Sequence, residues 1–197
     1  MQIAAIVLAA GLSSRMGSNK LIEEIEGEPM VRLVVQAVLA SRARPVFVVV
    51  GHDRENIVSA LDGLDVQIVE NPAYGEGLGT SISTGVVTVP DSCAGALIIL
   101  GDMPGISPGL IDRLIEHFES AGRDAICVAT HGGRRGHPVL FASRYFSELT
   151  SSSGDVGARR ILAAHADSLV DIEAGDDAPL ADIDTQAALA DWRHRRA

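Results

Sequence analysis

Cysteine is nearly absent from the 197-residue sequence, and no apolar run is long enough to cross a membrane. The two cysteines, Cys93 and Cys127, form no Cys-x-x-Cys motif, so we expect two small core residues in a protein of the reducing cytoplasm. The apolar run Ile3–Leu8 is far below the roughly 20 residues that a membrane-spanning helix needs. The sequence has no basic-then-apolar leader, which also favours a cytoplasmic protein.

Positive charge is also scarce, because 16 Lys and Arg residues stand against 26 Asp and Glu residues. The formal net charge of −10 argues against broad nucleic-acid binding and against adhesion to an anionic membrane. The six histidines show no His-x-x-x-His or His/Cys clustering, so a zinc site is not expected. Ser13 and Ser14 have no obvious histidine and aspartate partners, which leaves a serine hydrolase with little support.

What the sequence does contain is an alternation of short apolar runs with segments of helical period, without internal repeats or a long linker. This pattern predicts an α/β fold with a largely parallel sheet covered by helices on both faces, and the length predicts one domain. The expected strands are Ile3–Leu8, Pro45–Val50, Val66–Val69, Ala96–Leu100, Ala125–Ala129 and Pro138–Ala142. The expected helices are Pro29–Ser41, Arg54–Leu61, Thr80–Val87, Pro108–Ser120, Gly157–His165 and Thr185–Arg195.

A glycine- and serine-containing loop follows the first expected strand and carries two fixed cations, Arg15 and Lys20. Glycine allows close approach of backbone to a ligand, and turn amides with serine hydroxyls can face an anion, so the loop can cradle phosphates. The planar fork of Arg15 and the compact charge of Lys20 suit a triphosphate and its departing pyrophosphate. The spacing fits neither Gly-x-x-x-x-Gly-Lys-Ser/Thr nor Gly-x-Gly-x-x-Gly. The alternative is an ordinary turn with solvated cations.

The loop sequence LAAGLSSRMGSNK, residues 8–20, resembles the signature of nucleotidyltransferases with a Rossmann-like fold, in particular the molybdenum cofactor nucleotidyltransferases. The resemblance implies a single-domain, three-layer α/β/α fold over residues 1–197, with a nucleotide-binding half over about 1–105 and an acceptor-binding half over about 106–197. It gives catalytic roles to Arg15 and Lys20. The nucleotide contacts that it implies in this loop are Leu8, Ala9, Ala10, Gly11, Ser13, Ser14, Arg15 and Lys20.

Asp102 follows the buried strand expected at Ala96–Leu100, within the sequence Gly101-Asp102-Met103-Pro104. Ligands of such sheets collect beyond the carboxyl ends of the strands, so Asp102 and the glycine loop should share one edge. A carboxylate there suits Mg²⁺, which prefers oxygen ligands. The alternative is a turn or cap aspartate. In the resembling family this element carries the metal-binding aspartate, which implies a catalytic, metal-binding role for Asp102.

Asp184 is the second expected metal ligand, because the sequence Asp182-Ile183-Asp184-Thr185 resembles a late element of the same family. There the second aspartate joins the first on the metal, and the segment opens the last helix. Asp184 could instead only cap that helix. We expect Asp182 to turn to the other side of the extended segment.

The glycine-rich segment from Asn71 to Ser81 leads into a helix and resembles the family's Asn-Pro…Gly-x-x-x-Ser segment. The first backbone amides of a helix have no hydrogen-bond partner within the helix. Together with the hydroxyls of Thr80 and Ser81, they suit the binding of a base or ribose. The resemblance implies nucleotide contacts from Asn71, Gly79, Thr80 and Ser81. A flexible turn without such contacts is the alternative.

Two later elements narrow the family. The sequence Gly136-His137-Pro138-Val139 and the sequence GDVGAR at 154–159 resemble elements typical of the molybdopterin branch. They imply that Arg135, His137 and Arg159 bind the acceptor. A lone histidine before proline is often a structural or solvated residue, so substrate binding and not general base catalysis is expected of His137.

The implied reaction is transfer of CMP from CTP to molybdopterin, as molybdenum cofactor, with release of pyrophosphate and with Mg²⁺ as cofactor. The Leu-Ala-Ala-Gly opening resembles the cytidylyltransferase branch, because Ala10 adds a methyl group near the base. A guanylyltransferase or sugar-phosphate nucleotidyltransferase remains open. Two functions from other classes of protein also remain open. One is an NAD(P)H-dependent oxidoreductase on the same fold, and the other is a chaperone that hands a cofactor to a molybdoenzyme partner.

Overall fold

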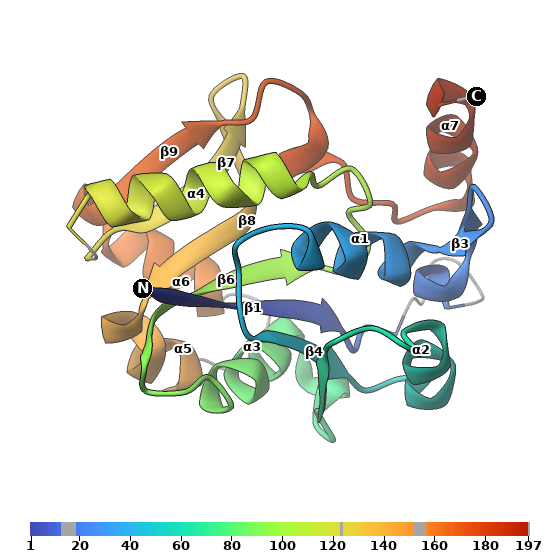
Figure 1. Cartoon of the computed structure of the whole chain (residues 1–197), viewed down its shortest axis with the longest axis horizontal. Helices are drawn as coiled ribbons and strands as arrows, with labels where there is room; N and C mark the ends of the chain where they lie inside the picture. Colours follow the sequence, from blue (N-terminus) through green and yellow to red (C-terminus); the bar gives the residue numbers. More distant parts are fainter. Residues whose placement is uncertain (13–18, 123, 152–156, 197) are drawn as a thin grey trace.

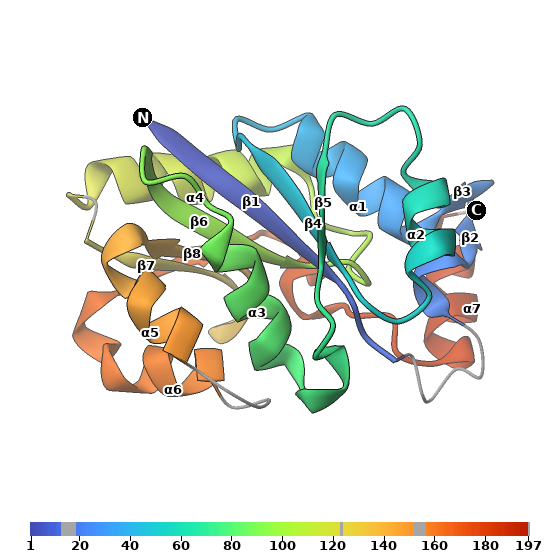
Figure 2. The ribbon, with the colours of Figure 1, turned by 90° about the horizontal axis from the view of Figure 1, so that it is seen from below.

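The computed structural model describes residues 1–12, 19–122, 124–151 and 157–196. A seven-stranded sheet lies between two layers of helices (Figures 1 and 2). Helices α1 (Met30–Leu39) and α4 (Pro108–Ser120) cover one face. Helices α3 (Leu78–Val87), α5 (Phe146–Ser151) and α6 (Gly157–Ala164) cover the other. This arrangement confirms the predicted three-layer α/β/α fold.

The sheet has the strand order β5-β4-β1-β6-β8-β7-β9. Among these strands only β8 runs against its neighbours, because β6 and β7 both pair with it in antiparallel fashion and the remaining pairs are parallel. The predicted, mostly parallel sheet is therefore confirmed. The strands are β1 (Gln2–Ala9), β4 (Val46–Val50), β5 (Gln67–Glu70), β6 (Cys93–Leu100), β7 (Ile126–His131), β8 (Arg134–Ala142) and β9 (Leu169–Glu173).

Strand β1 lies between β4 and β6 in the sheet. Its residues from Ile3 to Ala9 are all buried, as expected of a strand with helices on both faces. Ala9 is in register with Val50 of β4, and Leu8 with Leu100 of β6. The carboxyl ends of three parallel strands therefore meet at one edge of the sheet. Cys93 and Cys127 are free and buried, and burial raises the pKa of the Cys127 thiol to about 12.

Two sequence predictions on this sheet need correction. Strand β8 begins at Arg134 and not at Pro138, because the two-residue turn Gly132-Gly133 pairs His131 with Arg134. Both turn residues have positive φ, 56° and 76°, which glycine adopts readily and which tight hairpins require. The edge strand β9 was not predicted, because its half-buried residues form no strong apolar run.

The helix predictions are correct to within two residues at each end. Helix α2 covers Arg54–Ala60, and α7 covers Gln186–Arg196. Pro29 does not begin α1 as predicted, because it ends the strand β3 (Glu28–Pro29), which pairs with β2 (Glu24–Ile25). Helix α5 was missed. The short 3-10 helices are η1 (Lys20–Ile22), η2 (Tyr74–Glu76), η3 (Ser143–Tyr145), η4 (Ala166–Ser168) and η5 (Ala178–Leu180).

A second, smaller hydrophobic cluster holds the C-terminal segment in place. Helix α7 lies beside β3, away from the sheet (Figure 1). The buried members of this cluster are Ile25, Met30, Ile183, Leu189 and Trp192. They join the segment after Lys20 to the segment that carries Asp184.

Within the described ranges, no helix is both long and apolar enough to traverse a bilayer.

Candidate active site

A cavity of about 1090 Å³ opens at the sheet edge where β1 and β6 end. Ligand pockets typically have about 300–1,000 Å³, so this cavity is large enough for more than one small ligand. Its walls come from both halves of the chain, including the end of β1, the N-terminus of α3, the start of β8 and α6. Sequence-predicted site residues that line it are Leu8, Ala10, Gly11, Lys20, Gly79, Ser81, Asp102, Arg135, His137, Arg159 and Asp184.

Lys20 bridges the two predicted metal carboxylates. Its Nζ donates to Oδ2 of Asp102 at 2.6 Å and also to Oδ1 of Asp184. The three side chains come from η1, the end of β6 and the segment before α7, and are separated by 82 and 164 residues in sequence. Burial alone would lower the pKa of Lys20, but the ion pairs with Asp102 and Asp184 outweigh it and leave that pKa raised. The lysine is therefore a fixed cation between two anions.

Backbone contacts hold these segments together. The Ile183 amide donates to the carbonyl of Asp102 at 3.0 Å, and the Gly101 amide donates to the carbonyl of Leu8 at 3.0 Å. A Cβ at Gly101 would lie 3.0 Å from that same Leu8 oxygen, so glycine suits this close approach of the two strand ends. Asp102 is thereby tied to β1 on one side and to the segment of Asp184 on the other.

Asn19 fixes the position of Lys20, although the sequence argument gave it no role. Its Oδ1 accepts from the Leu21 amide at 3.1 Å, which caps η1, and its Nδ2 donates to Asp53 at 3.0 Å. Asparagine is a favoured cap residue, so the Asn-Lys-Leu sequence could have predicted the cap of η1. No sequence pattern indicates the contact with Asp53, which lies 34 residues away.

The two carboxylates fit a divalent cation. Oδ1 of Asp102 is buried and has no hydrogen-bond partner among the described residues. Leaving such an oxygen unpaired is costly, and a bound cation would satisfy it. The described ranges hold no cluster of three or more His, Cys, Asp or Glu side chains that could hold a metal. Mg²⁺ commonly binds through one or two carboxylates and completes its shell with water and substrate phosphates, which matches this pair.

The expectation for Asp182 was wrong. Asp182 and Asp184 both line the cavity, whereas the intervening Ile183 is buried in the second hydrophobic cluster. Residues two apart share a face of an extended segment, so the alternation that turns Ile183 inward turns both aspartates to the cavity. The ion pair with Lys20 still singles out Asp184.

The loop after β1 is described only in part. Leu8, Ala10 and Gly11 line the cavity, whereas Ala9 is buried and does not. A Cβ on Gly11 would meet no atom of the described residues within 4 Å, so packing against the described part of the chain does not require glycine there. Its exposed face is open to a ligand. The predicted contacts Ser13, Ser14 and Arg15 lie outside the described residues.

The segment before α3 is held by its own hydrogen bonds. Nδ2 of Asn71, which is 1% exposed, donates to the hydroxyls of Thr80 and Ser81 at 3.0 and 2.9 Å. Thr80 also lies within hydrogen-bond distance of the Ala73 and Gly77 carbonyls. Asn71 and Thr80 do not line the cavity, but Ser81 and Gly79 do. The structure thus gives Asn71 and Thr80 internal contacts that shape the loop.

The three predicted acceptor contacts lie along the far wall of the cavity. Arg135 forms a two-point ion pair with Asp171 of β9, with distances of 2.7 and 3.0 Å. Nδ1 of His137 lies 3.4 Å from the Ile98 carbonyl. Burial lowers the pKa of His137, only partly opposed by that carbonyl and by the charge of Asp102, and Arg159 lowers it further. His137 is therefore neutral near pH 7.

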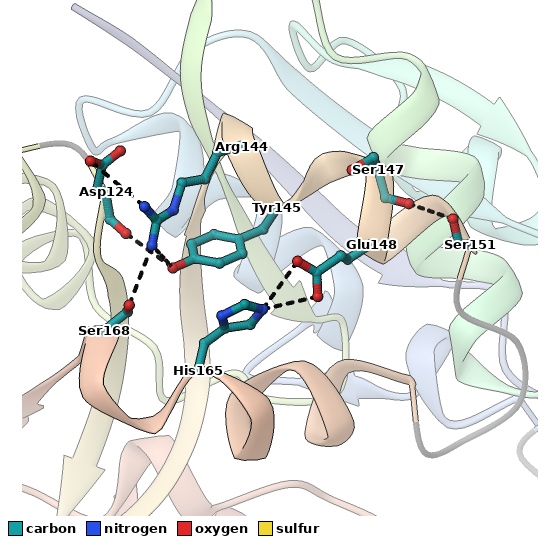
Figure 3. A network of polar contacts seen from close by, with 8 residues as sticks. All are labelled: Asp124, Arg144, Tyr145, Ser147, Glu148, Ser151, His165 and Ser168. Atoms are coloured by element: carbon teal, nitrogen blue, oxygen red, sulfur yellow. Dashed lines mark hydrogen bonds and ion pairs between the residues drawn. The ribbon is translucent and has the colours of Figure 1, made fainter.

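A network of polar contacts packs α5 and η3 against the segment that carries α6 (Figure 3). The Tyr145 hydroxyl donates to the Asp124 carbonyl at 3.2 Å, and Arg144 contacts both Tyr145 and Ser168. His165, which follows α6, lies 3.0 Å from a carboxylate oxygen of Glu148 on α5. These contacts fix the helix from which Arg159 reaches the cavity wall.

Two curated relatives are similar to this chain. The purine catabolism protein PucB of Bacillus subtilis is 29% identical over 191 residues, with 91% of this chain and 90% of PucB covered. The bifunctional protein GlmU of Sorangium cellulosum is 34% identical over 136 residues, with 65% of this chain covered. The matched region is 28% of GlmU, so this chain corresponds to little more than a quarter of that longer protein.

Solved structures share the fold across the chain. Rv0371c from Mycobacterium tuberculosis has a TM-score of 0.87 at 22% identity, and 98% of each chain is covered. A structure of the same protein in complex with manganese has a TM-score of 0.79 at 22% identity, covering 98% of this chain and 99% of the other. Molybdopterin-guanine dinucleotide biosynthesis protein A from Archaeoglobus fulgidus has a TM-score of 0.70 at 15% identity, with 98% of each chain covered.

The family model of the MobA-like NTP transferase domain matches residues 5–169. That range includes β1 from Ala5 onward, the Lys20 segment, Asp102 and the predicted acceptor residues, and it ends before Asp184. This chain belongs to the MobA-like NTP transferase domain family.

Proposed function

We propose that this protein is a nucleotidyltransferase that moves a nucleoside monophosphate from an NTP to a phosphorylated acceptor. The observation that carries the proposal is the ion-paired group of Lys20, Asp102 and Asp184. It lies in a cavity with glycine-rich backbone on one wall and arginine side chains on another. Such a cavity offers separate places for a nucleotide and for an anionic acceptor.

The nucleotide would lie against residues 1–105 and the acceptor against residues 106–197. On the nucleotide wall, Gly11 would give a ligand close access to the backbone, and Leu78 and Gly79 at the start of α3 line the cavity, where helix N-terminal amides suit an anion. Arg15 and Lys20 would stabilise the departing pyrophosphate. Asn71 and Thr80 would act by shaping the loop that presents Gly79 and Ser81.

Asp102 and Asp184 would hold a divalent cation, and Mg²⁺ is our proposal. Bound there, the cation would neutralise charge on the nucleotide phosphates and on the incoming acceptor. Oδ1 of Asp102, which has no hydrogen-bond partner among the described residues, supports this assignment. The manganese complex of Rv0371c, a protein of the same fold, is consistent with a divalent ion in this group of proteins.

No side chain needs to deprotonate the acceptor, because a phosphate monoester is already anionic at neutral pH. Its oxygen would attack the α-phosphorus, forming one P–O bond as the bond to the leaving pyrophosphate breaks. The protein's part is positioning and charge stabilisation. Arg135 and Arg159 supply positive charge for the acceptor phosphate. The neutral His137 side chain would form a hydrogen bond with the acceptor and would not act as a general base.

For the substrates we propose CTP and molybdopterin, as molybdenum cofactor, in the cytoplasm, with a molybdoenzyme as the protein that receives the product. Ala10 lines the cavity with a methyl group at the position where the cytidylyl branch differs from the guanylyl branch. The Gly136-His137-Pro138 element favours a pterin. The fold shared with molybdopterin-guanine dinucleotide biosynthesis protein A agrees with a molybdopterin acceptor. The similarity to GlmU and PucB leaves other acceptors as alternatives.

The test is pyrophosphate release with each of the four NTPs, with Mg²⁺ and molybdenum cofactor. Release with CTP supports the full proposal. Release with GTP alone would retain nucleotidyl transfer and overturn the choice of base. Sugar 1-phosphates in place of molybdenum cofactor test the acceptor. Binding of NADPH without binding of any NTP would overturn nucleotidyl transfer and favour an oxidoreductase.

A further inference from the structure

Lys20 lies where a divalent cation is expected to bind. Its ammonium contacts one oxygen of Asp102 and one oxygen of Asp184, and these are the two carboxylates that fit a metal. The Lys20 and Asp102 side chains are only 13% and 15% exposed, so water screens this attraction poorly. A metal ion and the Lys20 ammonium cannot both take the position between the carboxylates.

The charges at this point favour a divalent ion over the lysine. Taken by themselves, the Lys20 ammonium and the carboxylates of Asp102 and Asp184 sum to a net charge of −1, and Asp182 adds another carboxylate to the same cavity. Oδ1 of Asp102 is still without a hydrogen-bond partner in the described chain. A divalent ion would bring the three charges of metal and carboxylates to zero. Lys20 is therefore a weaker counter-ion that a metal can replace.

The local structure lets the ammonium leave while the backbone stays. Asn19 caps η1 and is tied to Asp53, and the next residue, Leu21, is 4% exposed in the core. The four-carbon stem of lysine is flexible, and Lys20 lines the open cavity. Released from the carboxylates, its ammonium can reach the space in which the proposed nucleotide phosphates would lie.

We propose that Lys20 is a resident counter-ion of the metal site, which a divalent metal displaces and thereby frees to bind phosphate. The proposal rests on the proposed function only for the identity of the metal carboxylates and of the phosphate ligand. It predicts effects of opposite sign for one substitution. Loss of the Lys20 charge tightens metal binding without nucleotide and weakens metal-dependent use of the nucleotide.

The first measurement is Mn²⁺ binding to the full chain without nucleotide, followed by the EPR signal of free Mn²⁺. We expect Lys20→Met to bind Mn²⁺ at least about tenfold more tightly than the wild type, because a competing opposite-charge contact is removed. Lys20→Arg keeps the positive charge and should bind as the wild type does. Arg42→Met changes net charge equally and should leave Mn²⁺ affinity unchanged. Arg42 pairs with Glu119 and precedes β4, so it lies toward the amino ends of the strands and not at the carboxyl ends where the cavity opens.

An Mn²⁺ affinity of folded Lys20→Met that equals or falls below the wild-type value would overturn the proposal. A lysine that only contacts phosphate predicts no change, and a lysine that only stabilises the site predicts weaker binding. The Asp102→Asn and Lys20→Met double variant must lose the tight binding, which ties the signal to this site. If the wild type releases pyrophosphate from an NTP but Lys20→Met binds Mn²⁺ no better, the inference fails and the proposed function stands. If no NTP is used at all, the proposed function fails.

Discussion

The chemistry of this molecule depends on a few side chains whose charge is set by their surroundings. Lys20 stays protonated because Asp102 and Asp184 hold it, and His137 stays neutral because its partial burial lowers its pKa. The two effects have opposite consequences. The ion pairs keep the Lys20 side chain charged in the cavity wall, whereas burial keeps the His137 side chain uncharged. The wall therefore presents a fixed pattern of charge to any ligand near neutral pH.

His137 should make stability depend on pH. Its pKa is lowered in the folded protein, while the unfolded chain has a value of about 6.5. Above that pH both states are neutral and His137 has no effect. As pH falls below it, the unfolded state takes up a proton that the folded state refuses, so stability is lost. Urea unfolding at several pH values should show a steeper acid loss in the wild type than in His137→Gln. Identical slopes would contradict this reading.

Among the elements, the contact between β8 and η5 links the cavity wall that carries Arg135 and His137 to the segment that carries Asp184. A Cβ on Gly136 would lie 1.9 Å from the Pro179 carbonyl oxygen, closer than any real contact allows. Pro179 belongs to η5, and the chain continues from there to Asp184. Glycine in the Gly136-His137-Pro138 element is thus needed for packing, whatever its role in binding.

We therefore expect Gly136→Ala to destabilise the protein by about 1–3 kcal/mol, the usual cost of overpacking. It should also weaken Mn²⁺ binding, because η5 must move. Gly109→Ala in α4 is the matched control, since a Cβ there meets no atom of the described chain within 4 Å. Removing a glycine at such a position changes stability little or raises it. Urea unfolding compares the two, and equal stability of both variants would contradict the packing role.

Helix α7 packs through Trp192 and Leu189 against the segment that carries Asp184. Trp192 is 7% exposed, and a Cβ on Gly105, three residues after Asp102, would lie 2.7 Å from its ring. We expect Trp192→Ala to cost about 3–5 kcal/mol, the usual cost of removing a large core side chain. The exposed neighbour Asp191 provides the control, because Asp191→Ala should change stability by less than about 0.5 kcal/mol. Thermal unfolding followed by circular dichroism measures both. A tolerated Trp192→Ala would show that α7 is dispensable for folding.

At the scale of the whole molecule, the alternation of apolar runs and helical periods was enough to predict the fold class. Strong apolar runs such as β1 and β4 were predicted to within one residue at each end, because burial on both faces demands them, whereas the prediction for β6 began three residues late. The half-buried β9 and the short pairing of β2 with β3 were missed, because tertiary contacts and not local pattern define them.

The candidate site could be predicted as a set of residues but not as a set of contacts. Lys20, Asp102 and Asp184 were expected near one sheet edge, and all three line the same cavity. That Lys20 would pair with both aspartates could not be predicted, since the pairing depends on distances set by the complete fold. Asp171, the partner of Arg135, lay on an unpredicted strand and was missed for that reason.

Nucleotidyl transfer at the carboxylates of Asp102 and Asp184 is the function that we propose for this protein. The most direct test is pyrophosphate release from CTP and molybdenum cofactor by the wild type, by Asp102→Asn and by Glu119→Gln, a surface carboxylate paired with Arg42. We predict metal-dependent release by the wild type and by Glu119→Gln, and a loss of about 10²-fold or more in folded Asp102→Asn, comparable to removing one group that stabilises transition-state charge. Undiminished release by a folded Asp102→Asn protein would contradict the account.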